Sequence, residues 1–386
     1  MKKNRRILSI MLILVMIMTS AIMTVFATGE EGNVNNADNE ESVAVDDYDF
    51  EEAEPSDAVT AEEPELDLVQ EEAMNAEGEE TAPTEEPAAP SKLDAVTNLK
   101  AVSLYGKKVK LTWKKSPNAA EYIIKYKAKG DDAYKSVTVN GKSKTISGLA
   151  YNTKYTFKVT ATAPGYKKSD AAKVTCKTDR KIKHITYKFT MKMGVTLTPH
   201  AGKKKNLRLH AGDKIESYRF KSGKYVITRN KSTYYINRVR ARNIKGVYTR
   251  KFNYTRTEAE NFVNAKKLKS QTKQMIWVST YTQHGYYFKK NSKGKWVCKR
   301  DWELATGKAD APTPTGIDGK VAIWKKISFR HGLRWWSCFS TYNAFHGKLN
   351  SWGLGKPASG GCVRNSVKDA KWVYNNVKMN STVFIY

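Results

Sequence analysis

Hydrophobic and polar residues alternate along short stretches of this chain, which is the pattern of half-buried β-strands. Within residues 91–178, every second position of three stretches is bulky and apolar: Val109, Leu111 and Trp113; Tyr122, Ile124 and Tyr126; Tyr155, Phe157 and Val159. Turn-forming pairs such as Asn140-Gly141 and Pro164-Gly165 separate such stretches. Residues 91–178 are therefore predicted to form a β-sandwich.

A second strand-rich stretch, residues 182–250, carries apolar runs such as Lys224–Ile227 and Tyr234–Ile236 among many basic residues. The turns around Gly212 and Gly223 separate its predicted strands. This pattern is typical of a small β-barrel, and the stretch resembles bacterial Src-homology-3-like wall-binding modules. A short helix is expected around Thr257–Ala265, ahead of the last part of the chain.

Residues 274–386 again predict mostly strands. The predicted strands of this part are Met275–Tyr281, Tyr286–Lys290, Trp296–Arg300, Val321–Ser328 and Val383–Tyr386. One helix is expected near the end, because Ser366 precedes Asp369 at the spacing of a helix cap. Val367, Ala370, Tyr374 and Val377 then recur at helical intervals. The whole chain is thus predicted to be mainly β and multidomain.

The first 27 residues have the parts of a secretory signal peptide. A basic start, Lys2–Arg6, precedes an apolar run from Ile7 to Met23, and Ala27 precedes the expected cleavage site. An uncleaved membrane anchor is the alternative, since the run is near the shortest length that spans a bilayer. In both cases the rest of the chain is expected outside the cytoplasm.

Charge divides the chain of 386 residues into two very different parts. Residues 28–90 hold 23 Asp and Glu and no Lys or Arg, and we expect a disordered linker there. A spacer is the simpler role for it, and a loose counter-charge is the alternative. Residues 92–386 hold 63 Lys and Arg against 15 Asp and Glu, a net charge of +48. Such an excess predicts an anionic polymer as a partner.

The chain has four cysteines, which are too few for a disulfide scaffold in an exported protein. They are Cys176, Cys298, Cys338 and Cys362. No C-x-x-C pair occurs, so a structural zinc site is not expected. A bridge between Cys298 and Cys338 is conceivable, although both lie in stretches that read as packed core. At least one thiol is therefore expected to be free.

Cys362 follows Gly360 and Gly361 and precedes the predicted helix. Glycines at these positions let backbone N–H groups turn inward, which suits the binding of an oxyanion. Arg364 and a nearby helix N-terminus would both favour the thiolate form of Cys362. The sequence therefore predicts a cysteine nucleophile with an oxyanion site at Gly360 and Gly361.

A cysteine nucleophile needs a base, and His346 lies sixteen residues upstream, followed by Gly347. An imidazole titrates near neutral pH and suits proton transfer. A second pair, His331-Gly332, has a different spacing to the cysteine and is not expected to be the base. The other histidines, His184, His200, His210 and His284, are expected to be exposed.

These residues together resemble the signature of the L,D-transpeptidases, the YkuD family. The matching positions are His346, Gly347, Gly355, Pro357, Ser359, Gly361, Cys362, Val363 and Arg364, with the upstream loops Ala305–Lys308 and Pro312–Gly316. The resemblance covers about residues 274–386. Two positions depart from it: Gly360 stands where many members have His, and Lys348 where Thr or Ser is frequent.

Residues 91–178 resemble a fibronectin type III domain, a spacer or adhesion module. Trp113 and Tyr122 occupy the expected strands, and Leu149 lies six residues before Tyr155, as in a tyrosine corner. The implied architecture is a fibronectin type III-like β-sandwich, a small β-barrel-like module and a β-rich catalytic domain with a short helix after the cysteine loop.

The family resemblance implies a secreted, cell-wall-associated enzyme that acts on peptidoglycan stem peptides. Cys362 would attack the carbonyl of the third stem residue and expel D-alanine, with His346 moving the protons. An amine from a second stem would complete a 3→3 cross-link, whereas water would make the enzyme an L,D-carboxypeptidase. Ser359 and Arg364 would shape the loop or contact substrate, and Tyr342 would line the donor pocket or pack internally.

A non-catalytic wall-binding or adhesion protein is the rival interpretation, and the presence of both Cys362 and His346 argues against it. Nucleic-acid binding would suit the charge, but export and the absence of a nucleic-acid motif disfavour it. No carboxylate pair, phosphate-binding loop or metal cluster appears in the sequence, so neither a cofactor nor a metal is implied.

Overall fold

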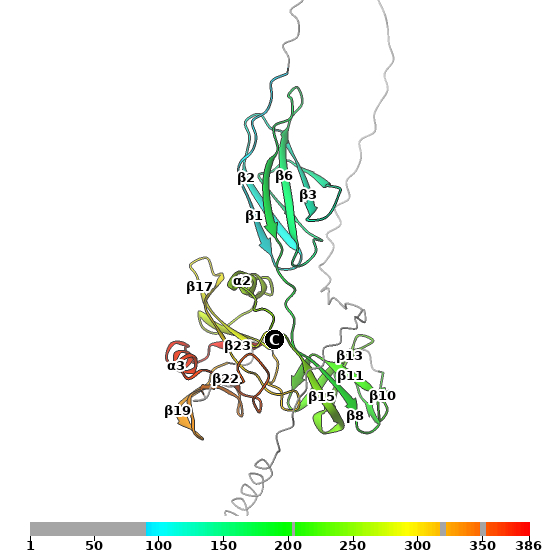
Figure 1. Cartoon of the computed structure of the whole chain (residues 1–386), viewed down its shortest axis with the longest axis vertical. Coiled ribbons are helices and arrows are strands. Elements are labelled where there is room, and N and C mark those ends of the chain that lie inside the picture. Colours follow the sequence, from blue (N-terminus) through cyan, green and yellow to red (C-terminus); the bar gives the residue numbers. More distant parts are fainter. Residues whose placement is uncertain (1–89, 203–204, 317–321, 348–352) are drawn as a thin grey trace, which may run out of the picture. The chain divides into compact units, whose positions relative to one another are not determined.

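The computed structural model describes residues 90–202, 205–316, 322–347 and 353–386 (Figure 1). The predicted signal peptide (1–27), nearly all of the acidic segment (28–90) and Lys348 lie outside the described residues. None of the helices in the described part of the chain combines the length and the apolar character needed to cross a bilayer.

The first domain is the predicted β-sandwich. One sheet has the order β1 (Thr97–Leu104), β2 (Lys108–Lys114), β5 (Ser143–Ile146); the other has the order β4 (Lys135–Val139), β3 (Glu121–Ala128), β6 (Lys154–Thr162), β7 (Ala172–Lys177). The alternating residues Leu111, Ile124 and Phe157 are fully buried between the sheets. Tyr155 Oη accepts a hydrogen bond from Ala150 N at 2.9 Å, so the predicted tyrosine corner is present.

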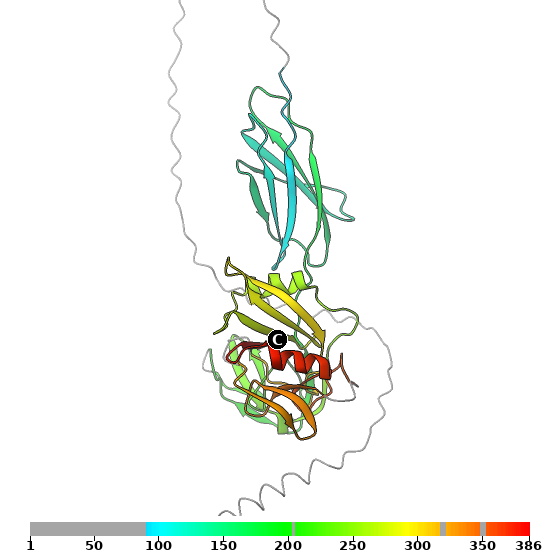
Figure 2. The ribbon, with the colours of Figure 1, turned by 90° about the vertical axis from the view of Figure 1, so that its left-hand side faces the viewer.

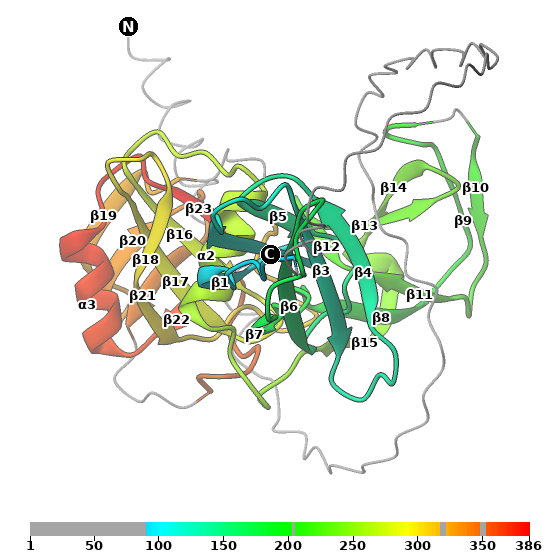
Figure 3. The same cartoon turned by 90° about the horizontal axis from the view of Figure 1, so that it is seen from above.

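The middle module, residues 182–250, consists of short strands around a core that includes Tyr187, Tyr225 and Ile236. Its strands form the sheets β11 (Lys214–Ser217), β8 (Thr186–Met191), β15 (Ala241–Val247) and β12 (Arg219–Lys221), β13 (Lys224–Arg229), β14 (Ser232–Asn237). The hairpin of β9 (Val195–Leu197) and β10 (Leu207–Leu209) lies beside β14 (Figure 3), and the 3-10 helix η1 spans Arg238–Arg240. The likeness to a Src-homology-3 barrel stays a prediction.

The short helix expected near Thr257 is α2 (Arg256–Ala265). Thr255 and Glu258 cap it reciprocally, each side chain binding the other residue's backbone N–H. Glu258 also pairs with Arg180, in the segment that leads into the middle module. The apolar side of α2, with Phe262 and Val263, packs in a cluster with Trp277.

The last domain has two four-stranded sheets. The first has the order β18 (Trp296–Glu303), β17 (His284–Lys290), β16 (Gln274–Ser279), β23 (Thr382–Ile385); the second has the order β19 (Lys325–Arg330), β20 (Leu333–Cys338), β21 (Ala344–Gly347), β22 (Val363–Asn365). Helix α3 (Val367–Asn376) packs against the second sheet (Figure 2). Side chains from both sheets and α3 share one core, which includes Ile276, Phe345 and Val373.

Three features of this domain differ from the sequence prediction. Strands β20 and β21 were not expected, because the aromatic run Trp335–Phe339 reads as core without a strand period. The strand predicted from Val321 begins at Lys325, and Val321 itself is outside the described residues. Finally, β22 intervenes between Cys362 and α3, so the cysteine turn does not run directly into the helix.

Candidate active site

The pairing of β21 with β22 brings His346 and Cys362 together. The two strands are parallel, with Phe345 opposite Val363 and His346 opposite Arg364. Side chains of paired residues point to the same face of a sheet, and alternate residues along a strand share that face. His346, Arg364 and Cys362, which immediately precedes β22, therefore lie on one face. The sequence predicted this grouping from a separation of sixteen residues.

The opposite face of the same sheet is closed by α3. A Cβ atom added to Gly347 would lie 2.8 Å from Val367 Cα, so only glycine allows the helix to approach this strand so closely. Ser366 caps the helix by accepting a hydrogen bond from Asp369 N at 3.0 Å, as predicted. Helix α3 thus supports the sheet from behind.

Ser359 shapes the loop that carries the cysteine. Its hydroxyl donates to Cys362 O and accepts a hydrogen bond from Gly361 N at 3.1 Å. The Gly361 N–H, which was predicted to bind an oxyanion, therefore donates to Ser359 instead. Gly360 differs from its neighbour, since a Cβ atom there would meet no atom within 4 Å.

The loop Ala305–Gly316, which contains both upstream motifs of the resemblance, supports the cysteine loop from the side. Thr313 Oγ1 accepts a hydrogen bond from Gly307 N at 2.8 Å and donates to Cys362 O at 3.4 Å. Lys308 N donates to Ser359 O at 2.9 Å. The carbonyl of Cys362 thus accepts hydrogen bonds from two hydroxyls, which fixes the backbone at the nucleophile.

Cys362 is half-buried, and its Sγ lies 3.7 Å from Tyr342 O. Burial raises the pKa of Cys362 above its ordinary value, and a backbone hydrogen bond at Ala344 and the charge of Arg364 only partly oppose it. Arg364 thus favours the thiolate, as expected, but the net shift is in the opposite direction, and the expected contribution of a helix end is absent. Burial outweighs Arg364, and β22 separates Cys362 from the N-terminus of α3.

Arg364 and Tyr342 take different places around the thiol. Arg364 is half-buried, its backbone pairs with Ala305, and burial lowers the pKa of its guanidinium. The side chain of Tyr342 is 87% exposed, so the alternative that it packs internally is wrong. Its ring is accessible to a ligand, while its carbonyl contacts the thiol.

Two residues near the reacting groups were missed in the sequence. Trp336 stacks on His346, with ring centroids 5.0 Å apart and an angle of 26° between the planes. Asn343 lies against the cysteine loop: a Cβ atom added to Gly361 would be 2.8 Å from its Nδ2. Neither residue belongs to a motif, so no sequence signal marked them.

Of the remaining histidines, His200 and His210 are exposed, as expected. His331 lies in the exposed turn between β19 and β20, where its φ is +48°. His284 is 6% exposed and its Nε2 lies 3.0 Å from Asp301 Oδ2, which corrects the expectation of exposure. His184 is half-buried, stacks on Tyr218, and burial lowers its pKa to about 4.

The four cysteines are free. Cys298 and Cys338 are buried, as their aromatic surroundings predicted, and they do not form a bridge. Within the described residues, no group of three or more His, Cys, Asp or Glu is arranged to hold a metal ion.

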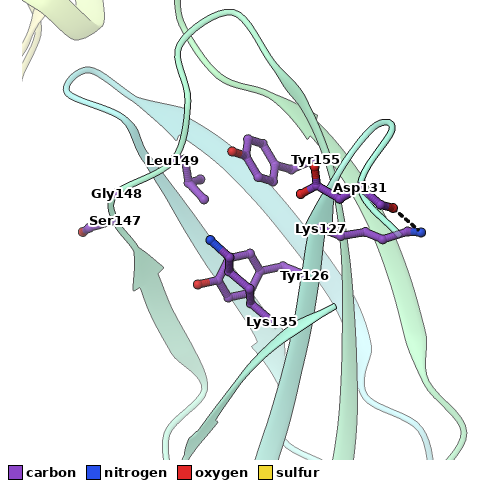
Figure 4. A pocket seen from close by; sticks show the side chains of 8 residues that line it. All are labelled: Tyr126, Lys127, Asp131, Lys135, Ser147, Gly148, Leu149 and Tyr155. Carbon is purple, nitrogen blue, oxygen red and sulfur yellow. Dashed lines mark hydrogen bonds between the residues drawn. The ribbon is translucent and has the colours of Figure 1, made fainter. Parts of the chain in front are cut away.

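A surface pocket in the sandwich domain contains none of the candidate residues (Figure 4). It is lined by residues of the sandwich such as Tyr126, Lys127 and Tyr155. Tyr155 already serves the tyrosine corner, and Lys127 Nζ donates to Asp131 O at 2.8 Å. These contacts are explained by the packing of the domain, and we assign no chemistry to this pocket.

Two family models match parts of the chain. Residues 273–385 match the L,D-transpeptidase catalytic domain, YkuD, and residues 94–176 match the fibronectin type III domain. No curated protein matches the chain.

Solved structures show similarity to single parts of the chain. An L,D-transpeptidase from Stackebrandtia nassauensis is 19% identical, over 34% of this chain and 65% of that chain, with a TM-score of 0.27. A fused Zn-dependent amidase/peptidase/peptidoglycan-binding domain-containing protein from Clostridium acetobutylicum is 24% identical, over 34% of this chain and 59% of that chain, with a TM-score of 0.30. The fibronectin type III domain of human collagen alpha-1(XX) is 21% identical, over 25% of this chain and 95% of that domain, with a TM-score of 0.22. The chain thus spans less than two thirds of the first two proteins.

Proposed function

Because the chain carries an L,D-transpeptidase catalytic domain behind a fibronectin type III domain, we propose that it is a secreted peptidoglycan L,D-transpeptidase that forms 3→3 cross-links. The observation that carries this proposal is the β21–β22 register, which puts His346 and Cys362 on one sheet face. A thiol and an imidazole in this arrangement are the nucleophile and base of acyl transfer.

The raised pKa of Cys362 defines the first step. At neutral pH the resting group is a thiol, so neutral His346 removes its proton as Sγ attacks the carbonyl of the third stem residue. The backbone N–H of Cys362 would bind the resulting oxyanion, because the N–H of Gly361 donates to Ser359. The imidazolium then gives its proton to the amine of D-alanine, which leaves as the thioester forms.

The second step consumes the thioester. A side-chain amine of a neighbouring stem attacks the thioester carbonyl, His346 takes the proton of that amine, and Cys362 leaves as the thiol by regaining it. The products are a cross-linked stem pair and the free enzyme. One D-alanine is released for each new amide bond.

Hydrolysis is the second candidate activity. Gly360 faces open space, where a bulkier residue would narrow the approach to the thioester. Water that enters there in place of the amine would release the tripeptide and make the enzyme an L,D-carboxypeptidase.

The middle module supports the proposal of an anionic cell-wall polymer as a second partner. Residues 182–250 hold 18 Lys and Arg, against only Asp213 and Glu216. On the outer face of the sheet β11-β8-β15, the exposed side chains include Lys188, Lys214, Arg242 and Lys245. Of these, Lys188 is paired with Glu216, with Nζ and Oε1 2.7 Å apart. The excess of cations favours a polyanion at the cell surface.

Product analysis with purified stem peptides tests the enzymatic part of the proposal. The wild-type chain is expected to release D-alanine from a disaccharide-tetrapeptide and to give a cross-linked dimer, whereas Cys362→Ala and His346→Ala give neither. Both variants should still bind cell walls, because neither residue lies in the basic module. Cross-linking by both variants would refute the assignment.

A further inference from the structure

A β-bulge stands directly beside the proposed base. Between β20 and β21, Arg334 pairs with Gly347 and Ser337 pairs with Phe345, so that Trp335 and Trp336 together oppose His346. Trp335 has a φ of +60°, in the left-handed region that bulky residues rarely adopt. Strained bulges of this kind persist where the surrounding structure requires them, often next to active sites, where they redirect a side chain.

The bulge sends the two tryptophans to opposite faces of the sheet. Trp335 meets Tyr374 of α3 edge to face, with ring centroids 5.3 Å apart, and Lys371 Nζ lies 5.3 Å from its ring. Trp336 lies on the face of the cysteine and stacks on His346. The indole of Trp336 is held in place, because its Nε1 donates to Leu333 O at 3.2 Å.

The stack bears on the charge that His346 acquires. The face of an indole ring is electron-rich and attracts a cation whose centre lies within about 6 Å of the ring centroid. The 5.0 Å between the two rings meets this condition. The imidazole becomes cationic only after it takes the proton of Cys362, so the attraction grows as the reaction proceeds.

Two arginines lie near this stack, and both oppose a positive charge on the imidazole. Arg364, opposite His346 on β22, disfavours a second positive charge. The thiols of Cys362 and Cys338 share the face, and burial raises the pKa of both above their ordinary values, which keeps them neutral. On β19, Arg330 places its guanidinium carbon 5.9 Å from the ring centroid of Trp336 and adds a further positive charge.

We propose that Trp336 is a positioning residue for the base: it fixes the plane of the His346 ring and stabilises its imidazolium form. The bulge at Trp335 is the device that delivers the indole to that ring. This proposal rests on the proposed function, since it gives His346 the role of base.

An NMR titration of the His346 ring in the full chain tests this role without any substrate. Loss of the signal in His346→Gln assigns it. In Trp336→Leu the midpoint of the titration is expected to move down by roughly half a pH unit or more, because the cation loses the indole. Trp336→Phe keeps a ring on His346 and should retain most of the wild-type midpoint. As a control, Trp324→Leu changes an exposed tryptophan outside the bulge and should leave the midpoint unchanged.

The same variants are then compared in turnover of the disaccharide-tetrapeptide. Trp336→Leu should lower kcat by roughly tenfold with little change in KM, and the acid limb of its pH profile should move with the NMR midpoint. An unshifted midpoint in Trp336→Leu, or an equal shift in Trp324→Leu, overturns the proposal. The NMR midpoint is measured without substrate. An inactive wild-type chain would therefore refute the proposed function, whereas the titration alone would still decide whether Trp336 stabilises the imidazolium.

Discussion

Gly361 combines two constraints that its neighbour Gly360 lacks. Its φ is +119°, and a Cβ atom would lie 2.8 Å from Asn343 Nδ2. Gly360 has no left-handed conformation and faces open space. The two adjacent glycines therefore form a matched pair for testing which of them the cysteine loop requires.

Gly361→Ala is expected to cost about 1–3 kcal/mol of stability, because an L-residue is strained at this φ and displaces Asn343. Turnover should fall at least tenfold, since the backbone at Cys362 moves with the loop. Gly360→Ala should stay within about 0.5 kcal/mol of wild type. Thermal unfolding and D-alanine release measure both effects, and similar losses in the two variants would contradict the loop geometry.

The identity of the site residues was accessible from sequence, whereas their electrostatics was not. His346, Ser359 and Cys362 stand at spacings that the motif preserves, and the structure gathers them around one loop. The pKa of Cys362 depends on burial, which a local pattern does not report. Arg364 is only two residues from Cys362 in the sequence, and its effect on the thiol was therefore overestimated.

At the scale of elements, the loop Ala305–Gly316 is held from two sides. At one side Thr313 binds Cys362 O and Gly307 N. At the other side Thr315 Oγ1 accepts a hydrogen bond from Phe220 N at 3.0 Å, and Tyr225 Oη donates to Ala309 O at 2.6 Å. The middle module thus supports the same loop that supports the nucleophile.

Two isosteric substitutions separate these contacts. Thr313→Val leaves the buried Gly307 N–H without its acceptor and is expected to cost about 1–3 kcal/mol and most of the activity. Thr315→Val removes only the contact with Phe220, so we expect a lower melting temperature and a smaller loss of kcat. Melting curves and kcat of the two variants check this order. A larger loss of kcat in Thr315→Val would show that the module contact governs the site.

The elements that the sequence missed share a physical cause. Trp335 and Trp336 are consecutive aromatic residues, and a strand period cannot be recognised across a bulge that inserts one residue. The left-handed conformation of Trp335 is imposed by packing against α3, which is distant in sequence. The sandwich was predicted from β2, β3 and β6, which alternate without such interruption, whereas its register shift lies in β1.

At the scale of the whole molecule, the basic charge is a property of surfaces rather than of the fold. Thr190 on β8 is flanked in register by Lys214 and by Arg242, and Lys245 stands opposite Lys188. Substitutions on this outer face of the middle module therefore test whether the module binds an anionic polymer.

A triple variant is expected to bind a polyanionic wall polymer roughly tenfold more weakly at low salt, with a weaker dependence on ionic strength. It combines Lys214→Gln, Arg242→Gln and Lys245→Gln. As a matched control, Lys100, Lys110 and Lys144 are exposed on the sandwich domain, and their replacement by Gln should change binding less. Pull-down of the full chain over a salt series measures both. Binding that is indifferent to salt in the wild-type chain would rule out attachment by charge.

The central claim is acyl transfer through Cys362, and the intact mass of the protein tests it most directly. The full chain is mixed with a disaccharide-tetrapeptide stem and its mass is recorded before any acceptor is added. The account predicts an adduct equal to the stem minus D-alanine, present in the wild-type chain and absent in Cys362→Ala. A folded chain with a reduced thiol that gives neither adduct nor D-alanine, or an adduct that persists in Cys362→Ala, would contradict it.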